Sequence, residues 1–237
     1  RLFAKSAKFM ACGFDRLDRL PLSAEDRKRV VGNPVRNPIK AVRDKPYPDL
    51  TDTSPLNILV TGGSQGARLF GEVIPKAIAS LPAEQRARLI VVQQAREEQV
   101  EAVRAAYREA GVKATVEAFF SDMQDRLAAA HLVIARAGAS TVTELAVAGR
   151  PAILIPLGIA MDDHQTANAE GMVTGAAADV VPEPKFTAEM LAPLLLERIS
   201  NAGVLRARAK AAWQLGKPNA ARELADLAEQ AAGVKAG

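Results

Sequence analysis

The sequence predicts an α/β fold in which helices cover both faces of a parallel sheet. From Asn57 onward, short apolar runs alternate with longer segments that carry helix signals. The first run ends directly in a glycine-rich turn, residues 62–66, and a helical pattern starts at Ala67. Strands that alternate with helices pair in parallel, because each helix returns the chain to the same edge of the sheet.

The composition favours a globular domain with a sizeable core. Of the 237 residues, 49% are hydrophobic and 24% are charged, and no apolar run approaches membrane-spanning length. We recognise no signal peptide, and the one cysteine, Cys12, excludes an internal disulfide and fits a reducing compartment. The formal charge of +4 suits anionic ligands or an anionic membrane surface. Nucleic acid is not indicated, because basic residues are scattered among acidic ones and aromatic residues are few.

The first part of the chain has the pattern of a domain end followed by a linker. We expect the end of a helix over residues 2–8, a strand over residues 9–13 and a helical turn at Ser23. A strand this early has no preceding partner, so the chain is expected to start inside a domain. Two prolines stiffen residues 32–38, and the polar, proline-rich residues 41–55 predict an interdomain linker.

The remaining elements follow in order along the chain. Gly111 and Gly149 are expected to end helices, Pro156 to stop a strand, and Ser121 with Gln124 to form a capping box. The expected strands are residues 58–60, 89–92, 115–119, 132–135, 152–155 and 179–181. The expected helices are residues 67 onward, 97–109, 121 onward, 140–148, 164–170 and 187–232, the last with a break at Pro218.

Three loops are expected at one edge of the sheet, where open parallel sheets bind ligands beyond the carboxyl ends of their strands. They are residues 62–66, 135–140 and 156–165. In the first loop the glycines let a phosphate approach the backbone, and the following helix start offers unpaired N–H groups and a positive dipole end. Ser64 adds a hydroxyl donor and Arg68 a charge. The spacing matches neither a Walker loop nor G-x-G-x-x-G, so a tight turn without a ligand is the alternative.

The second loop opens a helix that starts with hydroxyl-bearing residues. Thr141 and Glu144 lie one helical turn apart, and a carboxylate there can accept two hydrogen bonds from a ribose diol. The alternative, equally compatible with the spacing, is a T-x-x-E capping box in which Glu144 only satisfies backbone N–H groups. Ser140, Thr141 and the free N–H groups could also hold a diphosphate.

The third loop contains Asp162, Asp163, His164 and Gln165. Two carboxylates beside a histidine suggest a metal site or an acid/base pair, but the only other histidine, His131, falls at a core position before a strand. Without further ligands we favour helix capping for the two aspartates and assign no metal. Gln165 is a neutral donor and acceptor, which suits sugar hydroxyls.

Arg36 follows a proline-stiffened turn, where a held guanidinium suits phosphate recognition. A solvated linker arginine is the more common case at such a position. Elsewhere we expect structural roles: Cys12 as a packed small residue, Trp213 in the core, and Arg206, Arg208 and Lys210 on a solvated helix face. None of these positions defines a chemistry by itself.

Five blocks of sequence, taken together, resemble one known family. They are GNPVR at 32–36, GGSQGAR at 62–68, FFSDM at 119–123, RAGASTVTELAVAGRPAILIP at 136–156 and DDHQTANA at 162–169. In this order they resemble MurG, the family of N-acetylglucosaminyltransferases that make lipid II, and the resemblance covers essentially the whole chain. Five ordered blocks are far more specific than any one of them.

The resemblance implies a GT-B fold, in which two Rossmann-like domains face a cleft and the C-terminal one holds the nucleotide-sugar. It implies an inverting hexosyltransferase that moves GlcNAc from UDP-GlcNAc to undecaprenyl-pyrophosphoryl-MurNAc-pentapeptide, converting lipid I to lipid II in peptidoglycan synthesis. Such an enzyme would bind peripherally at the cytoplasmic face of the bacterial inner membrane, and no cofactor or metal is implied. The domains would be residues 1–36, the end of the acceptor-binding N-terminal domain; 37–56, a linker; 57–215, the UDP-GlcNAc-binding Rossmann-like domain; and 216–237, a C-terminal helix.

By this resemblance the donor site follows the motifs. Arg36 and Ser64 would lie near the diphosphate, the backbone of Phe120 would contact uracil, and Gln165 would contact a GlcNAc hydroxyl. The helix start that cradles the nucleotide would comprise Ala139, Ser140, Thr141, Val142, Thr143 and Glu144, with Glu144 on the ribose. The secondary candidates are Gly63, Gln65, Gly138 and Asn168. At positions 120 and 140 some relatives carry aliphatic residues, which a backbone contact tolerates.

The family's glycine-rich GGTGGH-like loop, which belongs to the acceptor domain, does not occur in this sequence. The general base and the membrane-docking patch implied by the resemblance would lie in that domain, so no catalytic residue is assigned in this chain. We expect the chain to bind UDP-sugar weakly and not to turn over alone. The alternatives are another GT-B UDP-sugar transferase or epimerase, and a non-catalytic nucleotide-sugar-binding module.

Overall fold

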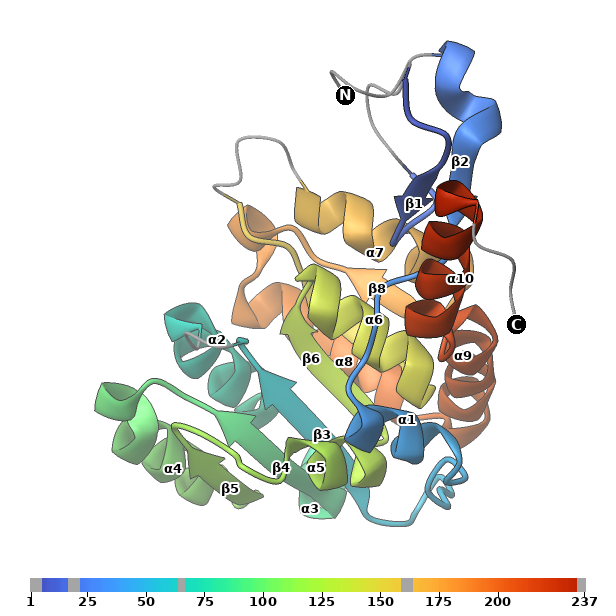
Figure 1. Cartoon of the computed structure of the whole chain (residues 1–237). Helices are drawn as coiled ribbons and strands as arrows, with labels where there is room; N and C mark the ends of the chain where they lie inside the picture. Colours follow the sequence, from blue (N-terminus) through green and yellow to red (C-terminus); the bar gives the residue numbers. More distant parts are fainter. Residues whose placement is uncertain (1–5, 17–21, 64–66, 159–163, 234–237) are drawn as a thin grey trace.

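The fold is built on a six-stranded parallel sheet (Figure 1). The computed structural model describes residues 6–16, 22–63, 67–158 and 164–233. The strands lie side by side in the order β5-β4-β3-β6-β7-β8. Their bounds are β3 Leu56–Thr61, β4 Leu89–Gln94, β5 Lys113–Glu117, β6 Leu132–Arg136, β7 Ala152–Ile155 and β8 Ala178–Val180. The predicted α/β class, a Rossmann-like parallel sheet, is confirmed, and the strand order reverses between β3 and β6.

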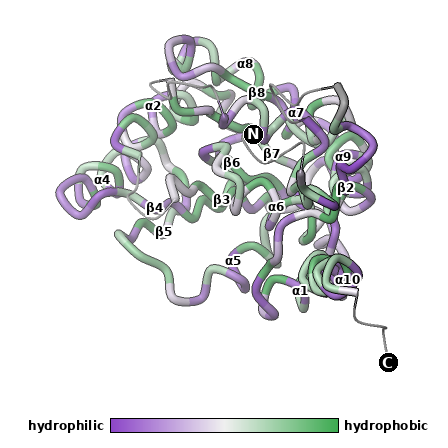
Figure 2. The backbone as a smooth tube through the Cα atoms, turned by 45° about the horizontal axis from the view of Figure 1, so that its top comes forward, coloured by the Kyte–Doolittle hydropathy of each residue, from purple (hydrophilic) through white to green (hydrophobic). Residues whose placement is uncertain are grey.

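The central strands are made of aliphatic residues because both faces of the sheet are covered. All four residues of β7 are buried, and so are the first four of β6. Alternate residues of β3 serve opposite faces, so Ile58 and Val60 pack into one core while Leu59 packs into the other. In Figure 2 the hydrophobic colour gathers in these central strands, and hydrophilic stretches lie on outer helices such as α4.

Helices cover the two faces of the sheet in two groups. Helices α2 (Arg68–Ala79), α4 (Val100–Glu109) and α8 (Ala188–Ile199) pack on the face of Ile58 and Val60. The face of Leu59 is covered by α1 (Asn37–Arg43), α5 (Met123–Ala129), α6 (Ala139–Ala148) and α7 (His164–Thr174). Helix α9 (Ala202–Leu215) contributes to both cores, through Leu205 and Ala212. The short helical segments are α3 (Ala83–Arg88), η2 (Glu97–Gln99) and η3 (Glu183–Lys185).

The two ends of the described chain meet beside this sheet. Strand β1 (Met10–Cys12) pairs in parallel with β2 (Lys28–Val30), and η1 (Leu22–Arg27) connects to β2. Helix α10 (Ala220–Ala232) lies next to these strands in Figure 1. Lys8 Nζ donates to the carbonyl of Gln230 at 2.9 Å, and Lys217 Nζ donates to that of Val30 at 2.7 Å. No helix in the described ranges has both the length and the apolar character of a bilayer span.

Every predicted strand is present, with ends that differ by a few residues, but several local predictions were wrong. Strand β2 and helix α1 were not predicted. The sequence Lys-Arg-Val has one apolar residue, and α1 begins in the proline-stiffened segment 32–38 and ends in the predicted linker. The Ser121 capping box does not form, since α5 begins at Met123. Its N-cap residue is Asp122, whose carboxylate instead accepts from Arg126 Nε at 2.8 Å.

Helix α9 corrects two further expectations. Trp213 was expected in the core, yet 48% of its surface is exposed. The buried positions of α9 are Ala202, Leu205, Ala209 and Ala212, so position 213 falls at the rim of the packed stripe. The prediction that Arg206, Arg208 and Lys210 lie on a solvated helix face was also wrong in part. Arg208 Nη2 donates to the half-buried carboxylate of Asp179 at 2.7 Å.

Arg150 closes the carboxyl ends of two helices from inside the protein. Its side chain is 1% exposed, and its guanidinium donates to four backbone carbonyls at 2.8 to 3.2 Å. Two belong to the end of α5, Leu127 and Ala128, and two to the end of α6, Ala148 and Gly149. Helix ends leave such carbonyls without helical partners, so a buried cation there replaces water. Burial lowers the pKa of Arg150 to about 10, which leaves it charged at neutral pH.

His131 couples the start of β6 to the start of β3, and its predicted core position is confirmed. The N–H of Asn57 donates to His131 Nδ1 at 2.8 Å, so Nε2 carries the proton toward the carbonyl of Asp49, 3.3 Å away. Burial lowers the pKa of His131, and the contact with the Asp49 carbonyl only partly opposes this. Protonation therefore requires that the native contact with Asn57 be lost.

Because the pKa of His131 is lower in the folded state, the unfolded chain binds a proton first as the pH falls. The free energy of unfolding is expected to be highest above about pH 6.5 and to decrease below it, down to the folded-state pKa. Denaturant unfolding measured across this pH interval should show that the free energy of unfolding of the parent protein falls as the pH falls. In His131→Asn the dependence of this free energy on pH should have a smaller slope. An equal slope in both proteins would contradict the assignment.

Candidate functional site

A cavity of about 1190 Å³ opens at the carboxyl ends of β3, β4 and β6. Thr61, Gln94 and Arg136, from the ends of these three strands, line it. The strand order reverses between β3 and β6, and open α/β sheets bind their ligands at such reversal points. Ligand cavities usually measure roughly 300–1,000 Å³, so this one has room for a nucleotide-sugar.

Two helices point their amino ends into this cavity. Helix α2 begins after Ala67 and α6 after Gly138, and neither N-cap residue offers a side-chain hydrogen bond to the helix. Neither first turn contains an acidic residue. The leading N–H groups of both helices, together with the positive ends of their dipoles, therefore suit a bound anion such as a phosphate.

The glycine turn between β3 and α2 lies on the same cavity. Gly63 has φ +80°, a conformation that favours glycine, and a Cβ added there would meet no atom within 4 Å from the described residues other than its chain neighbours. The positive φ explains this glycine, and the open space leaves the backbone accessible to a ligand. Of the other residues predicted in this turn, Ser64 and Gln65 lie outside the described residues. Arg68 lines the cavity and is paired with Glu72 at 2.8 Å.

Glu144 and Arg36 form an ion pair at the edge of the cavity. Nε and Nη2 of Arg36 both donate to Oε1 of Glu144, at 3.3 and 3.1 Å. The capping-box interpretation of Glu144 is wrong, because α6 begins after Gly138 and Thr141 is already its third residue. Arg36 is not simply a solvated linker residue either, although 69% of its side chain is exposed. The second oxygen of Glu144 forms no hydrogen bond with any described residue and can accept one from a ligand.

The first turn of α6 and the start of α7 place the other predicted residues differently. Gly138, Ala139, Ser140 and Thr141 line the cavity, and so does Gln165, whose Oε1 accepts from the N–H of Leu157 at 3.0 Å. Val142 and Thr143 do not line it, since both side chains are buried on the core side of α6. Asn168 donates to the carbonyl of Ala137 at 3.1 Å and holds the turn before α6. Asp162 and Asp163 lie outside the described residues.

The loop after β5 forms another wall of the cavity. Phe120 lines it with a buried side chain, and the Arg126 guanidinium lies 5.1 Å from its ring centroid. Because the ring is anchored in this way, the backbone around Phe120 is held at the cavity. Phe119 also lines the cavity and is 74% exposed, which the sequence did not reveal, since residues 115–119 were expected to be strand.

An ion pair that the sequence did not reveal joins three elements at the cavity floor. Arg136 Nη2 donates to Glu183 Oε1 at 2.7 Å, and both side chains are largely buried. The N–H of Gly158 donates to the second oxygen of Glu183, also at 2.7 Å. Burial opposes the charge on Glu183, but these two contacts outweigh it and lower the pKa of Glu183. Glu183 therefore holds the backbone of Gly158, shortly after the end of β7.

Gln94, also not predicted, connects the glycine turn with the loop of Phe120. Its Nε2 donates to the carbonyl of Ala118 at 3.1 Å, and its Oε1 accepts from the hydroxyl of Thr61 at 2.9 Å. The same hydroxyl accepts from the N–H of Gly63 at 3.3 Å. A polar residue at the end of an apolar strand was the only sequence signal. In the described part of the chain, no cluster of histidine, cysteine or acidic residues is arranged to hold a metal.

A parallel sheet with a cavity at the point where its strand order reverses defines a Rossmann-like domain. The family model of the glycosyltransferase family 28 C-terminal domain matches residues 57–230, so the chain belongs to this glycosyltransferase family. The resemblance to MurG is confirmed. The crystal structure of Acinetobacter baumannii MurG superposes with a TM-score of 0.68 at 37% identity, over 81% of this chain and 53% of that one.

Curated relatives carry one shared name, UDP-N-acetylglucosamine–N-acetylmuramyl-(pentapeptide) pyrophosphoryl-undecaprenol N-acetylglucosamine transferase. The protein of Maricaulis maris is 52% identical over 225 residues, which are 95% of this chain and 61% of the relative. That of Rhodospirillum centenum is 48% identical over 236 residues, 99% of this chain and 62% of the relative. The chain thus spans about three fifths of the length of these relatives.

Proposed function

We propose that this chain supplies the donor-binding half of an inverting N-acetylglucosaminyltransferase. The reaction transfers GlcNAc from UDP-GlcNAc to undecaprenyl-pyrophosphoryl-MurNAc-pentapeptide, the donor and acceptor in the names of its relatives. The observation that carries the proposal is the cavity between two uncapped helix starts, with the Glu144–Arg36 pair at its edge. We further propose the domain limits 1–36, 37–56, 57–215 and 216–237.

In this proposal the diphosphate of the donor occupies the space between the amino ends of α2 and α6. Arg36, Ser64 and the first N–H groups of α6 contact it, while the free oxygen of Glu144 accepts from the ribose. The backbone at Phe120 contacts uracil, and Gln165 contacts a hydroxyl of GlcNAc. Ser140 and Thr141 offer hydroxyl donors beside the diphosphate. Val142 and Thr143 serve by packing the helix, since their side chains are buried.

This half of the enzyme acts on the leaving group. When the C4 hydroxyl of the acceptor sugar attacks the anomeric carbon from the opposite side, the bond to UDP breaks and negative charge grows on the diphosphate. Preorganised N–H groups and the Arg36 guanidinium stabilise that charge, and one such donor typically contributes about 3 kcal/mol to lowering the barrier. The base that removes the hydroxyl proton would come from the part of the relatives that this chain does not span.

The acceptor named for the relatives ends in a long polyprenyl chain, so the complete enzyme must work at a membrane surface. We propose peripheral association at the cytoplasmic face of the inner membrane. The net charge of +4 favours an anionic lipid surface but is modest. Vesicle flotation of the full-length protein, with and without anionic lipid, measures this directly.

Calorimetric titration of the chain with UDP-GlcNAc, UDP-glucose and ADP-glucose tests the donor assignment. We expect weak binding of both uridine nucleotides, a preference for UDP-GlcNAc and the weakest binding of ADP-glucose. Joined to the upstream part of the protein, the chain should transfer GlcNAc to the lipid-linked acceptor, and alone it should not. Equal affinity for ADP-glucose would contradict the site. If the joined protein binds the donor but does not transfer GlcNAc, the alternative of a non-catalytic nucleotide-sugar-binding module would hold instead.

Gln94→Leu is expected to weaken UDP binding about tenfold without unfolding the protein. Leucine keeps the volume, but the Thr61 hydroxyl and the Ala118 carbonyl lose their partner, at about 1 kcal/mol for each lost hydrogen bond. The glycine turn and the Phe120 loop then lose their connection beneath the nucleotide. Calorimetry should show the loss in this variant and none in the exposed control Gln214→Leu. Unchanged affinity for UDP in Gln94→Leu would show that UDP binding does not depend on this connection.

A further inference from the structure

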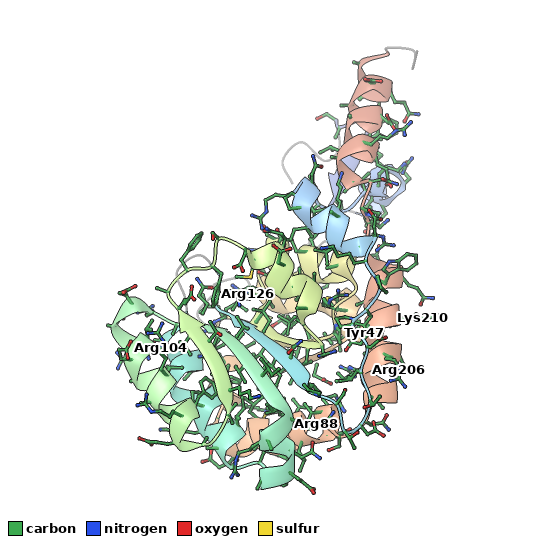
Figure 3. The ribbon with its side chains drawn as sticks, turned by 90° about the horizontal axis from the view of Figure 1, so that it is seen from below. Tyr47, Arg88, Arg104, Arg126, Arg206 and Lys210 are labelled. Atoms are coloured by element: carbon green, nitrogen blue, oxygen red, sulfur yellow. The ribbon has the colours of Figure 1, made fainter. Side chains whose placement is uncertain are left out.

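A second cavity, of about 870 Å³, lies at the opposite edge of the sheet, where the strands begin. We name it the amino-edge groove. One wall is the segment of residues 43–51, and the other is formed by α9 and by the end of α6 at Gly149 and Arg150. Figure 3 labels Tyr47 of the first wall, and Arg206 and Lys210 of α9, on this side of the molecule. Because the donor cavity opens at the carboxyl ends of the strands, the two cavities lie on opposite edges.

The amino-edge groove carries an excess of positive charge. Five cationic side chains line it, against the two carboxylates of Asp44 and Asp49; the five are Arg43, Lys45, Arg150, Arg206 and Lys210. The three arginines donate to backbone carbonyls, and none of them forms an ion pair with a described acidic residue. Lys45 and Lys210 are exposed, and neither forms an ion pair with a described residue. An anionic ligand would thus meet two exposed lysines that have no ion-pair partner among the described residues.

An aromatic and apolar surface lies between these cations. Trp213 lines the groove with 48% of its surface exposed, and the Arg43 guanidinium stacks 4.0 Å from its ring centroid. Tyr47 is held in place by donating its hydroxyl to the carbonyl of His131 at 2.7 Å, and Leu50 is buried beneath. Tryptophan, tyrosine and arginine are the residues that dominate protein–protein binding sites. The groove therefore offers apolar contacts as well as charge.

The walls of the groove are fixed before any ligand arrives. Pro46 and Pro48 restrict the backbone of the outer wall, and Arg206 of α9 donates to the carbonyl of Leu50 across the groove. Arg43 ties the same wall to α6 and α9 through the carbonyls of Val147 and Trp213. A preformed site loses little conformational entropy when a ligand binds.

We propose that the amino-edge groove binds an extended, acidic and apolar segment of a partner protein. Acidic side chains would pair with Lys45 and Lys210 at the rim, while an apolar side chain would pack on Trp213 and Tyr47. Tyr47 is partly buried whereas Lys45 and Lys210 are exposed, so a single side chain that enters the groove suits this site better than a flat lipid surface. A partner bound here leaves the donor cavity on the far edge open. The proposal does not depend on the function assigned to that cavity.

Trp213 is the only tryptophan of the chain, so its fluorescence reports on this groove alone. The probe is a labelled decapeptide of alternating glutamate and leucine, compared with glutamine–leucine and lysine–leucine peptides of equal length. Fluorescence anisotropy and Trp213 emission are recorded for the parent chain, for the double variant Lys45→Glu/Lys210→Glu and for the control Lys113→Glu/Arg222→Glu. All four substituted positions are exposed, and the charge change is the same in both variants. Circular dichroism and thermal unfolding verify that each variant is folded.

The glutamate peptide should shift Trp213 emission and bind, and its affinity should fall at least about tenfold in Lys45→Glu/Lys210→Glu and less than about twofold in the control. Salt raised from about 0.1 M to about 1 M should weaken binding further. No binding, equal binding of the glutamine or lysine peptide, or equal loss in the control would overturn the proposal. So would a Trp213 shift produced by phosphatidylglycerol vesicles but not by the peptide, or self-association that the double variant abolishes.

Discussion

Replacing Arg150 with methionine is expected to lower the free energy of unfolding by about 3–5 kcal/mol. The guanidinium satisfies four carbonyls at the ends of α5 and α6 in a site with 1% exposure. Methionine keeps the aliphatic stem but donates nothing, and each buried acceptor left without a partner costs about 1–3 kcal/mol unless water enters. For a chain of this size, each kcal/mol corresponds to roughly 2–4 °C in melting temperature.

The matched control is Arg206→Met, because Arg206 makes a single contact with a backbone carbonyl and is exposed. It should lose no more than about 1 kcal/mol. Denaturant unfolding and calorimetry on both variants separate the two cases. A similar small loss in both would show that water replaces the buried guanidinium, and the helix ends would then not depend on it.

Removing the carboxylate of Glu144 is expected to reduce affinity for UDP-GlcNAc about tenfold to a hundredfold. In the proposed pose the free oxygen of Glu144 accepts from the ribose, and a hydrogen bond to a charged group contributes about 1.5–3 kcal/mol. Glu144→Ala should therefore weaken UDP-GlcNAc and UDP alike, since both carry the ribose. In the joined, active enzyme the same change should raise KM.

Arg36 must be tested together with Glu144, because the two side chains are in contact at 3.1 Å. Glu144→Ala frees the guanidinium for the diphosphate, so the loss in the double variant Glu144→Ala/Arg36→Met should differ from the sum of the single losses. Glu109→Ala, an exposed acidic position on α4, is the control and should bind normally. Unchanged affinity in Glu144→Ala would place the ribose elsewhere.

Local sequence pattern was sufficient to predict the sheet and the edge at which the cavity opens. Strand β7 is an uninterrupted apolar run with a proline on each side, and its predicted bounds are those observed. Gly62 and Gly63 before α2 and the start of α6 both line the cavity, as their positions after strands indicated. Strand β2 could not be found this way, since its stability comes from pairing with β1, and α1 is stabilised by packing on α6.

The residues of the candidate site that lie in sequence motifs were predicted. The contacts whose partners are distant in sequence were not. Arg136 and Glu183 are 47 positions apart, and Gln94 contacts residues 33 positions before it and 24 after it. No spacing rule links such residues; only the convergence of strand ends does so. The same holds for the amino-edge groove, whose two walls come from residues 43–51 and from α9.

The sequence by itself determined the fold class, the edge at which the cavity opens and the family, because strand–glycine–helix order and apolar periodicity are local properties of the chain. The tertiary structure alone decided whether Glu144 caps a helix or pairs with Arg36, and whether Trp213 is buried or exposed. Those outcomes depend on which side chains the packing of helices on the sheet brings within a few ångströms, and no local pattern encodes that distance.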